Sequence, residues 1–236
     1  MVADSALRKP ANRPSRRQDL IEAAIDLFSL QPWDFVTVAD IVERAGMTPA
    51  AFYYHFSSRE QLLEEIVEGF AEEWVAMIDR LLAAADTPES LWDVPIALLD
   101  DVEQHEQAAR IFFLSSATAP LLVDRIRRDA RNRLIKLATA AIRRLAPDRR
   151  AAESHVNGVA MIVVYETAVR ARLALDEPYR TLGPRRFRDE LWNLSRVSTG
   201  FSNGKRRVGR RTAAKSQVRH RPASAASIER ARDPPS

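Results

Sequence analysis

Apolar residues recur every three to four positions along most of this chain. Such spacing gathers apolar side chains on one face of an α-helix, whereas a half-buried strand needs strict alternation. Seven glycines and thirteen prolines are spread over 236 residues. The sequence therefore predicts an all-α protein. The first two helical faces are Leu20, Ile21, Ala24, Leu27 and Phe28, then Val38, Ile41, Val42 and Ala45.

Capping residues predict two short helices joined by a tight turn. Thr37 stands three residues before Asp40, a spacing in which a threonine caps a helix and the acid returns the hydrogen bond. Gly46 suits the left-handed residue that ends a helix. Thr48 then caps the next helix, and Pro49 occupies its first position, where a missing N–H has no cost. Two such helices, preceded by a third, form a helix-turn-helix unit.

Longer helices are expected after this unit. Ser57 with Glu60, and Ser58 with Gln61, offer overlapping capping boxes for a fourth helix that runs to about residue 85. Further helical patterns cover residues 89–106, 107–116, 120–145, 149–175 and 184–198, which makes about nine helices in all. We expect four segments: a basic flexible arm (1–17), the helix-turn-helix domain (18–62), a larger helical domain (63–200) and a disordered basic tail (201–236).

Charge is distributed unevenly along the chain. The first eighteen residues carry a net charge of +4 and residues 199–236 a net charge of +8, whereas the part between them carries −8. Basic ends on an acidic body indicate either an anionic polymer or surface as partner, or simply solvated tails, and composition favours neither.

Composition also excludes several classes of protein. The chain has no cysteine, so it has neither disulfides nor a cysteine-ligated metal site. Its four histidines, His55, His105, His155 and His220, are too scattered to suggest a metal centre, and we expect no cofactor. Nucleophile elbows and phosphate-binding glycine loops are absent, so an enzyme is not expected. Without an apolar run of about 18 residues or a secretory signal, we expect a cytoplasmic protein with no membrane partner.

The aromatic residues of the third helix are divided between two faces. Phe52 and Phe56 lie four residues apart and share a face, so we expect both in the core. Ala50, Ala51 and Tyr54 are left on the other side, near the start of a helix of the size that enters a major groove. Alanine has no group that hydrogen-bonds a base, although it can pack against thymine methyls. Direct readout should therefore be modest, with DNA shape contributing more.

Residues 20–63, and TVADIVERAGMTPAAFYYHFSSREQLL above all, resemble the N-terminal domain of the TetR family of transcriptional regulators. The resemblance implies contacts with the DNA backbone for Thr37, Thr48, Tyr53, His55 and Arg59. It implies contacts with bases for Pro49, Ala50, Ala51 and Tyr54. A surface-packed pair is the alternative for the two tyrosines, and a hydrogen bond within the fold is an equal alternative for His55.

The chain departs from the family in two places. Pro32 stands where the family usually has a glycine, and since proline cannot take a positive φ, the first helix must end differently. Ala39 stands where many members have a basic residue. Residues 19–58 are strongly acidic, so the basic flank must supply attraction for phosphates. That flank comprises Arg8, Lys9, Arg13, Arg16 and Arg17.

The resemblance further implies a homodimer and a cavity for an unidentified small-molecule effector. The dimer would form through a four-helix bundle, with Val159, Ile162, Val163, Val169, Trp192 and Leu194 as candidate contacts. The alternative is that these residues complete a monomer core. The cavity would be lined by Trp74, Trp92, Phe112, Phe113, Met161 and Tyr165, although ordinary core packing is the alternative for each.

We interpret the chain as a sequence-specific regulator, a repressor that binds a palindromic double-stranded DNA operator and is released by a ligand. A dimer would place two recognition helices about one helical turn apart, roughly 34 to 36 Å. The alternative is an architectural protein that binds DNA through its basic ends with little sequence preference.

Overall fold

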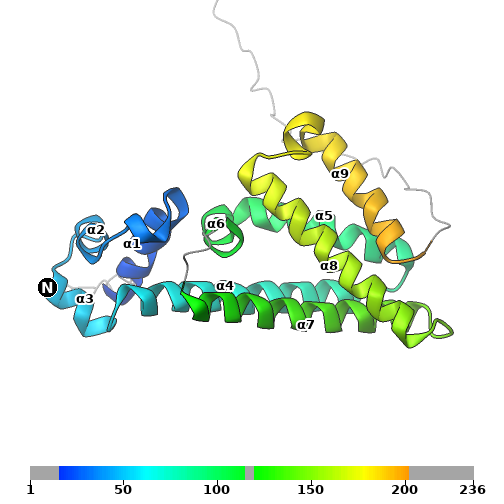
Figure 1. Cartoon of the computed structure of the whole chain (residues 1–236), viewed down its shortest axis with the longest axis horizontal. Helices are drawn as coiled ribbons and strands as arrows, with labels where there is room; N and C mark the ends of the chain where they lie inside the picture. The colour runs from blue at the N-terminus through cyan, green and yellow to red at the C-terminus, as the bar shows by residue number, and fades with distance from the viewer. Residues whose placement is uncertain (1–15, 115–119, 202–236) are drawn as a thin grey trace, which may run out of the picture. The chain divides into compact units, whose positions relative to one another are not determined.

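A computed structural model describes residues 16–114 and 120–201 of the chain (Figure 1). Within these ranges the protein forms nine α-helices and one 3₁₀ turn and no strand, which confirms the predicted all-α class. The predicted arm up to residue 15 and the predicted tail from residue 202 lie outside the described residues. The elements are α1 (Arg16–Leu30), η1 (Trp33–Phe35), α2 (Val38–Arg44), α3 (Pro49–His55), α4 (Arg59–Ala84), α5 (Pro88–Gln104), α6 (Glu106–Leu114), α7 (Leu121–Leu145), α8 (Ala151–Ala174) and α9 (Tyr179–Ser198).

The short helices begin and end at the residues that the sequence predicted. Thr37 Oγ1 accepts a hydrogen bond from the Asp40 N–H at 3.2 Å, and the Asp40 carboxylate accepts one from the Thr37 N–H at 2.7 Å. Gly46 ends α2 with a φ of 63°. Thr48 Oγ1 accepts the N–H of Ala51 at 3.3 Å, so α3 starts at the next residue. Local hydrogen bonding therefore sets the positions of α2 and α3.

The start of α4 differs in detail from the prediction. Ser58 is the capping residue, and its Oγ accepts the Gln61 N–H at 3.2 Å. Gln61 Oε1 in turn accepts the Ser57 N–H at 2.7 Å, so the predicted box of Ser57 with Glu60 does not form. Because Ser58 and not Ser57 is the capping residue, α4 begins at Arg59.

Helices α4 to α9 form the rest of the described fold (Figure 1). Helix α7 packs along both α4 and α8, and α9 packs on α8 and α5. Gly158 allows the close approach of α8 to α7, because a Cβ at this position would lie 2.5 Å from Thr139 Oγ1. Gly183, with φ 71° and ψ 167°, separates the first turn of α9 from the rest, so the predicted start at Pro184 is the start of its longer segment.

A continuous apolar core runs from α1 to α9, so the helix-turn-helix unit shares its core with the larger part. Polar contacts strengthen this connection. Asp26 on α1 accepts hydrogen bonds from Arg44 on α2 at 2.6 Å and from Gln107 on α6 at 3.0 Å. Arg110 on α6 donates to the carbonyl of Ser29 at 3.2 Å. These hydrogen bonds join α6 directly to α1.

Candidate nucleic-acid interface

Helix α3 is anchored by its two phenylalanines. Phe52 is fully buried and Phe56 is 1% exposed, and their ring centroids lie 5.8 Å apart. This confirms the prediction that both rings belong to the core. Because residues four apart share a helix face, the anchoring of these two rings leaves Pro49, Ala50, Tyr53 and Tyr54 exposed to solvent.

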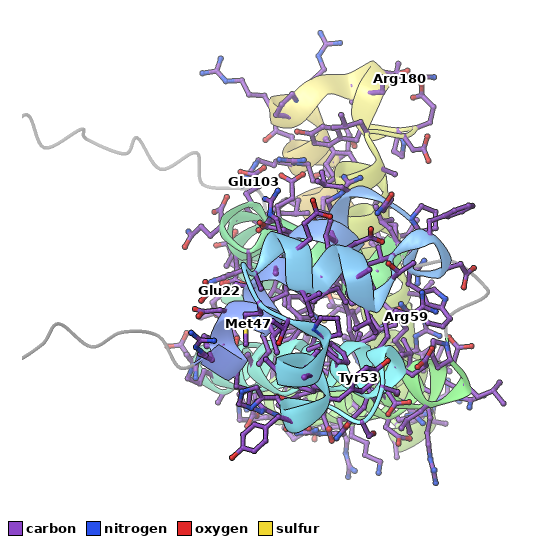
Figure 2. All side chains as sticks on the ribbon, turned by 90° about the vertical axis from the view of Figure 1, so that its left-hand side faces the viewer. Glu22, Met47, Tyr53, Arg59, Glu103 and Arg180 are labelled. Atoms are coloured by element: carbon purple, nitrogen blue, oxygen red, sulfur yellow. The ribbon has the colours of Figure 1, made fainter. Side chains whose placement is uncertain are left out.

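The outward side of α3 is small at its start and aromatic further on. Thr48, Pro49 and Ala50 are exposed and Ala51 is half-buried. Tyr54 is 84% exposed and Tyr53 is 59% exposed, which makes them the largest side chains on this surface. Helix α3 lies at the front of the view in Figure 2, where Tyr53 is labelled. Helix α3 therefore exposes two phenol groups, and the side chains at its N-terminal end are small enough to let a partner approach the helix closely.

His55 lies at the end of α3 and is half-buried. Its ring packs edge-on against Tyr54, with centroids 4.9 Å apart. The imidazole therefore helps to orient the most exposed ring of the surface.

Thr37 lies at the start of α2, with its hydroxyl already in use. The hydroxyl donates to the Asp40 carboxylate at 2.7 Å while accepting the Asp40 N–H. The two hydrogen bonds from Thr37 hold the pKa of the Asp40 carboxyl below its ordinary value. The Thr37 hydroxyl can therefore donate to a DNA phosphate only if it gives up its hydrogen bond to the Asp40 carboxylate.

Arg59 has a role that the sequence did not reveal. Its guanidinium donates to the backbone carbonyls of Trp33, at 3.2 Å, and Val36, and it lies 4.2 Å from the centre of the Trp33 ring. Only 19% of the side chain is exposed. Arg59 thus holds the turn that links α1 to α2. Because 26 residues separate it from Trp33, no local spacing indicated this contact.

The same turn explains how α1 ends without the family's usual glycine. Pro32 has φ −55° and ψ 139°, which leads the chain into η1 instead of a left-handed turn. The Phe35 N–H then donates to the Pro32 carbonyl at 3.0 Å. This confirms that the first helix ends differently.

Two of the predicted flanking bases begin α1. Arg16 is exposed. Arg17 forms an ion pair with Glu65 of α4 and lies 4.7 Å from the centre of the Phe56 ring. The hydrogen bond to Glu65 raises the pKa of Arg17. Arg17 therefore also braces α1 against α4. The other bases of the arm, Arg8, Lys9 and Arg13, lie outside the described residues.

Most of the predicted effector-site residues lie in the core between α4, α6 and α8. Trp74 stacks on Tyr165 with centroids 5.6 Å apart and meets Phe113 edge-on at 5.6 Å. Phe112 contacts Phe113, and Met161 belongs to the same core. All are buried and most touch each other, which is the packing alternative that the sequence left open.

Trp92 is separated from this group. Its Nε1 donates to Thr199 Oγ1 at 2.9 Å, and its ring meets Trp192 edge-on at 5.2 Å, between α5 and α9. A cavity of about 650 Å³ lies elsewhere, between α1, α4 and the junction of α5 with α6. Trp74 is the one predicted residue that lines it.

The predicted dimer contacts divide by burial. Val163 and Leu194 are 50% and 51% exposed, and Val159 is half-buried. In contrast, Ile162, Val169 and Trp192 are buried in the protomer, which agrees with the alternative that they complete a monomer core. Because α8 packs on α6, α7 and α9 at once, its apolar residues surround it almost completely and their spacing cannot show which face is outward.

Two exposed valines extend the candidate dimer surface beyond the prediction. Val156 on α8 is 64% exposed and Val197 on α9 is 68% exposed. Neither was predicted, because each is a single valine outside the periodic core pattern.

Across residues 16–114 and 120–201, no cluster of three metal-ligating side chains occurs, and no helix is both long and apolar enough to cross a membrane. The side chains exposed at the starts of α2 and α3 include the hydroxyls of Thr37 and Thr48 and the small side chain of Ala50. Hydroxyl donors at helix starts contact phosphate oxygens well, while small residues and a phenol reach base edges.

Comparison with known proteins agrees with this geometry. Residues 20–66 match the family described as bacterial regulatory proteins, TetR family. The transcriptional repressor KstR2 of Mycolicibacterium smegmatis is 29% identical over 109 residues, which are 46% of this chain and 53% of KstR2. The chain thus spans about half the length of this relative.

Solved structures show the same fold. A TetR-like regulator from Rhodococcus superposes with a TM-score of 0.63 at 17% identity, over 82% of this chain and all of that one. SmeT in complex with triclosan superposes with a TM-score of 0.59 at 22% identity, over 78% of this chain and 88% of SmeT. The helix-turn-helix unit of this chain is thus similar to that of the TetR family, and its described helices are arranged as in these solved structures.

Proposed function

We propose that this protein is a sequence-specific DNA-binding transcriptional regulator, a repressor that inserts α3 into the major groove of its operator. The observation that carries the proposal is the division of α3: Phe52 and Phe56 hold it from inside, and its exposed side presents small residues and two phenols. A helix exposed in this way fits a groove about 12 Å wide. The repressor relative KstR2 supports the direction of regulation.

The exposed residues divide between phosphate and base contacts. For phosphates we propose Thr37, Thr48, Tyr53, His55 and Arg16. For base edges we propose Pro49, Ala50, Ala51 and Tyr54. Arg59 and Arg17 mainly hold other elements in place: Arg59 holds the turn before Thr37, and Arg17 holds α1 against α4. Phosphate contacts set register, and sequence choice comes from the base edges.

A homodimer follows from the exposed apolar residues of α8 and α9. Val156, Val163, Leu194 and Val197 are each at least half exposed, and such residues gathered on neighbouring helices indicate an interface. Beside them, a shallow apolar cavity of about 210 Å³ is lined by Val163 and Leu194 among others. The dimer gives each half of a palindromic operator its own α3.

The regulator is proposed to respond to a small molecule, as SmeT's complex with triclosan suggests for a related fold. Helix α4 begins directly after α3 and carries Trp74 into the aromatic core. A ligand that shifts α4 would change the separation of the two α3 helices and weaken operator binding. The ligand can shift the equilibrium between the operator-binding state and the released state only by the difference between its binding free energies for the two.

Selection of DNA from a random pool tests the proposal. We expect a palindromic consensus whose half-sites are centred about one helical turn apart, roughly 10 base pairs. A selected consensus without two-fold symmetry would refute binding as a dimer to two half-sites. It would favour an architectural protein that binds DNA through its basic ends.

Substitutions test how the contacts divide. Tyr53→Phe removes one hydroxyl and should weaken binding to specific and random DNA alike, by about 1 kcal/mol. Tyr54→Ala should chiefly relax the preference at one base pair. Equal losses on both kinds of DNA for both variants would contradict the assignment.

Sedimentation tests the interface. Leu194→Glu places a charge on the proposed surface and should yield monomers at micromolar concentration. Leu121→Glu is the matched control, because Leu121 is 87% exposed at the start of α7 and should leave the dimer intact. A wild-type protein that sediments as a monomer would exclude the dimer.

A further inference from the structure

A small, strongly charged pocket lies between the end of α6 and the helices α7 and α8. Its volume is about 230 Å³. Two aromatic rings and six charged side chains line it, and the charged groups carry a net charge of +2. The lining residues are Phe112, Phe113, Asp124, Arg127, Arg128, Arg131, Glu166 and Arg170.

The two carboxylates of this pocket already face arginines. Arg131 Nε donates to both carboxylate oxygens of Glu166, at 3.0 and 2.8 Å. Asp124 Oδ1 lies 3.4 Å from Arg127 Nη1. Arg128 and Arg170 have no acidic partner within residues 16–114 and 120–201, so the excess positive charge of the pocket resides on them.

Arg127 is incompletely satisfied. Its side chain is only 16% exposed, and Nη2 donates to the Ile111 carbonyl at 3.1 Å. Its Nε is buried and has no hydrogen-bond acceptor among the described residues. Burial lowers the pKa of Arg127; Asp124 opposes this, and the neighbouring charge of Arg170 adds to it. A buried donor of this kind is costly, and an acceptor placed in the pocket would relieve both the missing hydrogen bond and the repulsion.

We propose that this pocket binds an oxyanion, a carboxylate or a phosphate ester, carried on an apolar group. The oxygens of the anion meet Arg127, Arg128 and Arg170, which supply planar donors suited to such groups. The apolar part lies against Phe112 and Phe113. A few convergent polar groups beside aromatic walls are the usual composition of a small-molecule site.

The pocket is connected to the candidate DNA-binding surface through its aromatic wall. Phe112 lies 5.2 Å from Phe70 of α4, and Phe113 lies 5.6 Å from Trp74 of the same helix, between ring centroids. Helix α4 starts at Arg59, which holds the turn before α2. If the proposed function holds, the effector that shifts α4 is an anion that repositions Phe112 and Phe113.

Isothermal titration calorimetry of the full chain tests the site directly. The probes are hexanoate, hexyl phosphate, inorganic phosphate and hexylammonium. We expect both hexyl anions to bind and hexylammonium not to bind. Arg128→Gln and Arg170→Gln should each lower the affinity for the anions about tenfold, the loss of roughly 1.4 kcal/mol expected for one charge-assisted contact. Arg125→Gln is the matched control, because Arg125 is an exposed residue of α7 outside the lining.

Each outcome decides a separate point. Absence of anion binding, or an equal loss in the Arg125→Gln control, would overturn the site. Inorganic phosphate that binds as tightly as hexyl phosphate would overturn the apolar part of the ligand. Operator binding is measured separately with and without hexanoate. Anion binding without a change in operator affinity would keep the pocket and refute its effector role, whereas failure to bind any palindromic DNA would refute the proposed function alone.

Discussion

The close approach of α7 and α8 gives a quantitative test of the fold. A Cβ added at Gly158 would lie 2.5 Å from Thr139 Oγ1, 2.9 Å from Thr139 N and 3.2 Å from Thr139 Cα. Two of these atoms are backbone, and Oγ1 donates to the Ile135 carbonyl at 2.7 Å, so rotation of the side chain cannot relieve the overlap. We therefore predict that Gly158→Ala forces α7 and α8 apart.

The expected magnitude combines two opposing effects. Replacing a helical glycine by alanine stabilises the folded state by about 0.5 to 1 kcal/mol through backbone entropy. Overpacking of a close contact costs about 1 to 3 kcal/mol. Gly158→Ala should thus be destabilising by up to about 2.5 kcal/mol, with about 1 kcal/mol from the middle of the two ranges. Gly69→Ala is the matched control, because a Cβ at Gly69 of α4 meets no atom within 4 Å, and it should be stabilising.

Urea denaturation followed by circular dichroism at 222 nm measures both variants, with the midpoint concentration as the readout. The midpoint should fall for Gly158→Ala and rise for Gly69→Ala. If both variants raise the midpoint equally, the helices can separate without cost and the reasoning from close approach is refuted.

Three further predictions concern the helix-turn-helix unit and the tail. A lysine at position 59 lacks the planar guanidinium that contacts two carbonyls and stacks on Trp33 at once. Arg59→Lys should therefore destabilise the fold by roughly 1 to 2 kcal/mol and shift the tryptophan fluorescence. An unchanged emission spectrum would count against this contact. Hydrogen bonds from Arg44 and then Gln107 hold the pKa of Asp26 below its ordinary value of 3.8. The folded state then binds fewer protons, so this stabilisation is complete above the ordinary value and is lost as pH falls through the lower folded value. Asp26→Asn should flatten the loss of melting temperature below about pH 4, and an unchanged pH profile would contradict it. Deletion of residues 202–236 should reduce the slope of log affinity for DNA against log salt and leave sequence preference intact, and an equal slope would exclude a contact from the tail.

The helical class, and the starting points of α2 and α3, could be predicted from the sequence. Thr37 with Asp40, and Thr48 with Pro49, interact over one helical turn, so their effect depends on spacing and hardly on the rest of the fold. The same is true of Phe52 and Phe56, whose shared face follows from helical geometry. These local rules identified the helix-turn-helix unit and the exposed side of α3.

Tertiary structure decided the roles that depend on how helices pack. Arg59 meets Trp33 because the start of α4 lies against the turn after α1, and a separation of 26 residues hides that contact from any local pattern. Trp192 is buried because α9 rests on α5, which periodicity alone could not distinguish from an outward face. The arginines of α7 and α8 form one cationic pocket for the same reason. Helix formation is governed by neighbours in sequence, whereas the relative placement of helices is governed by the packing of all their side chains together.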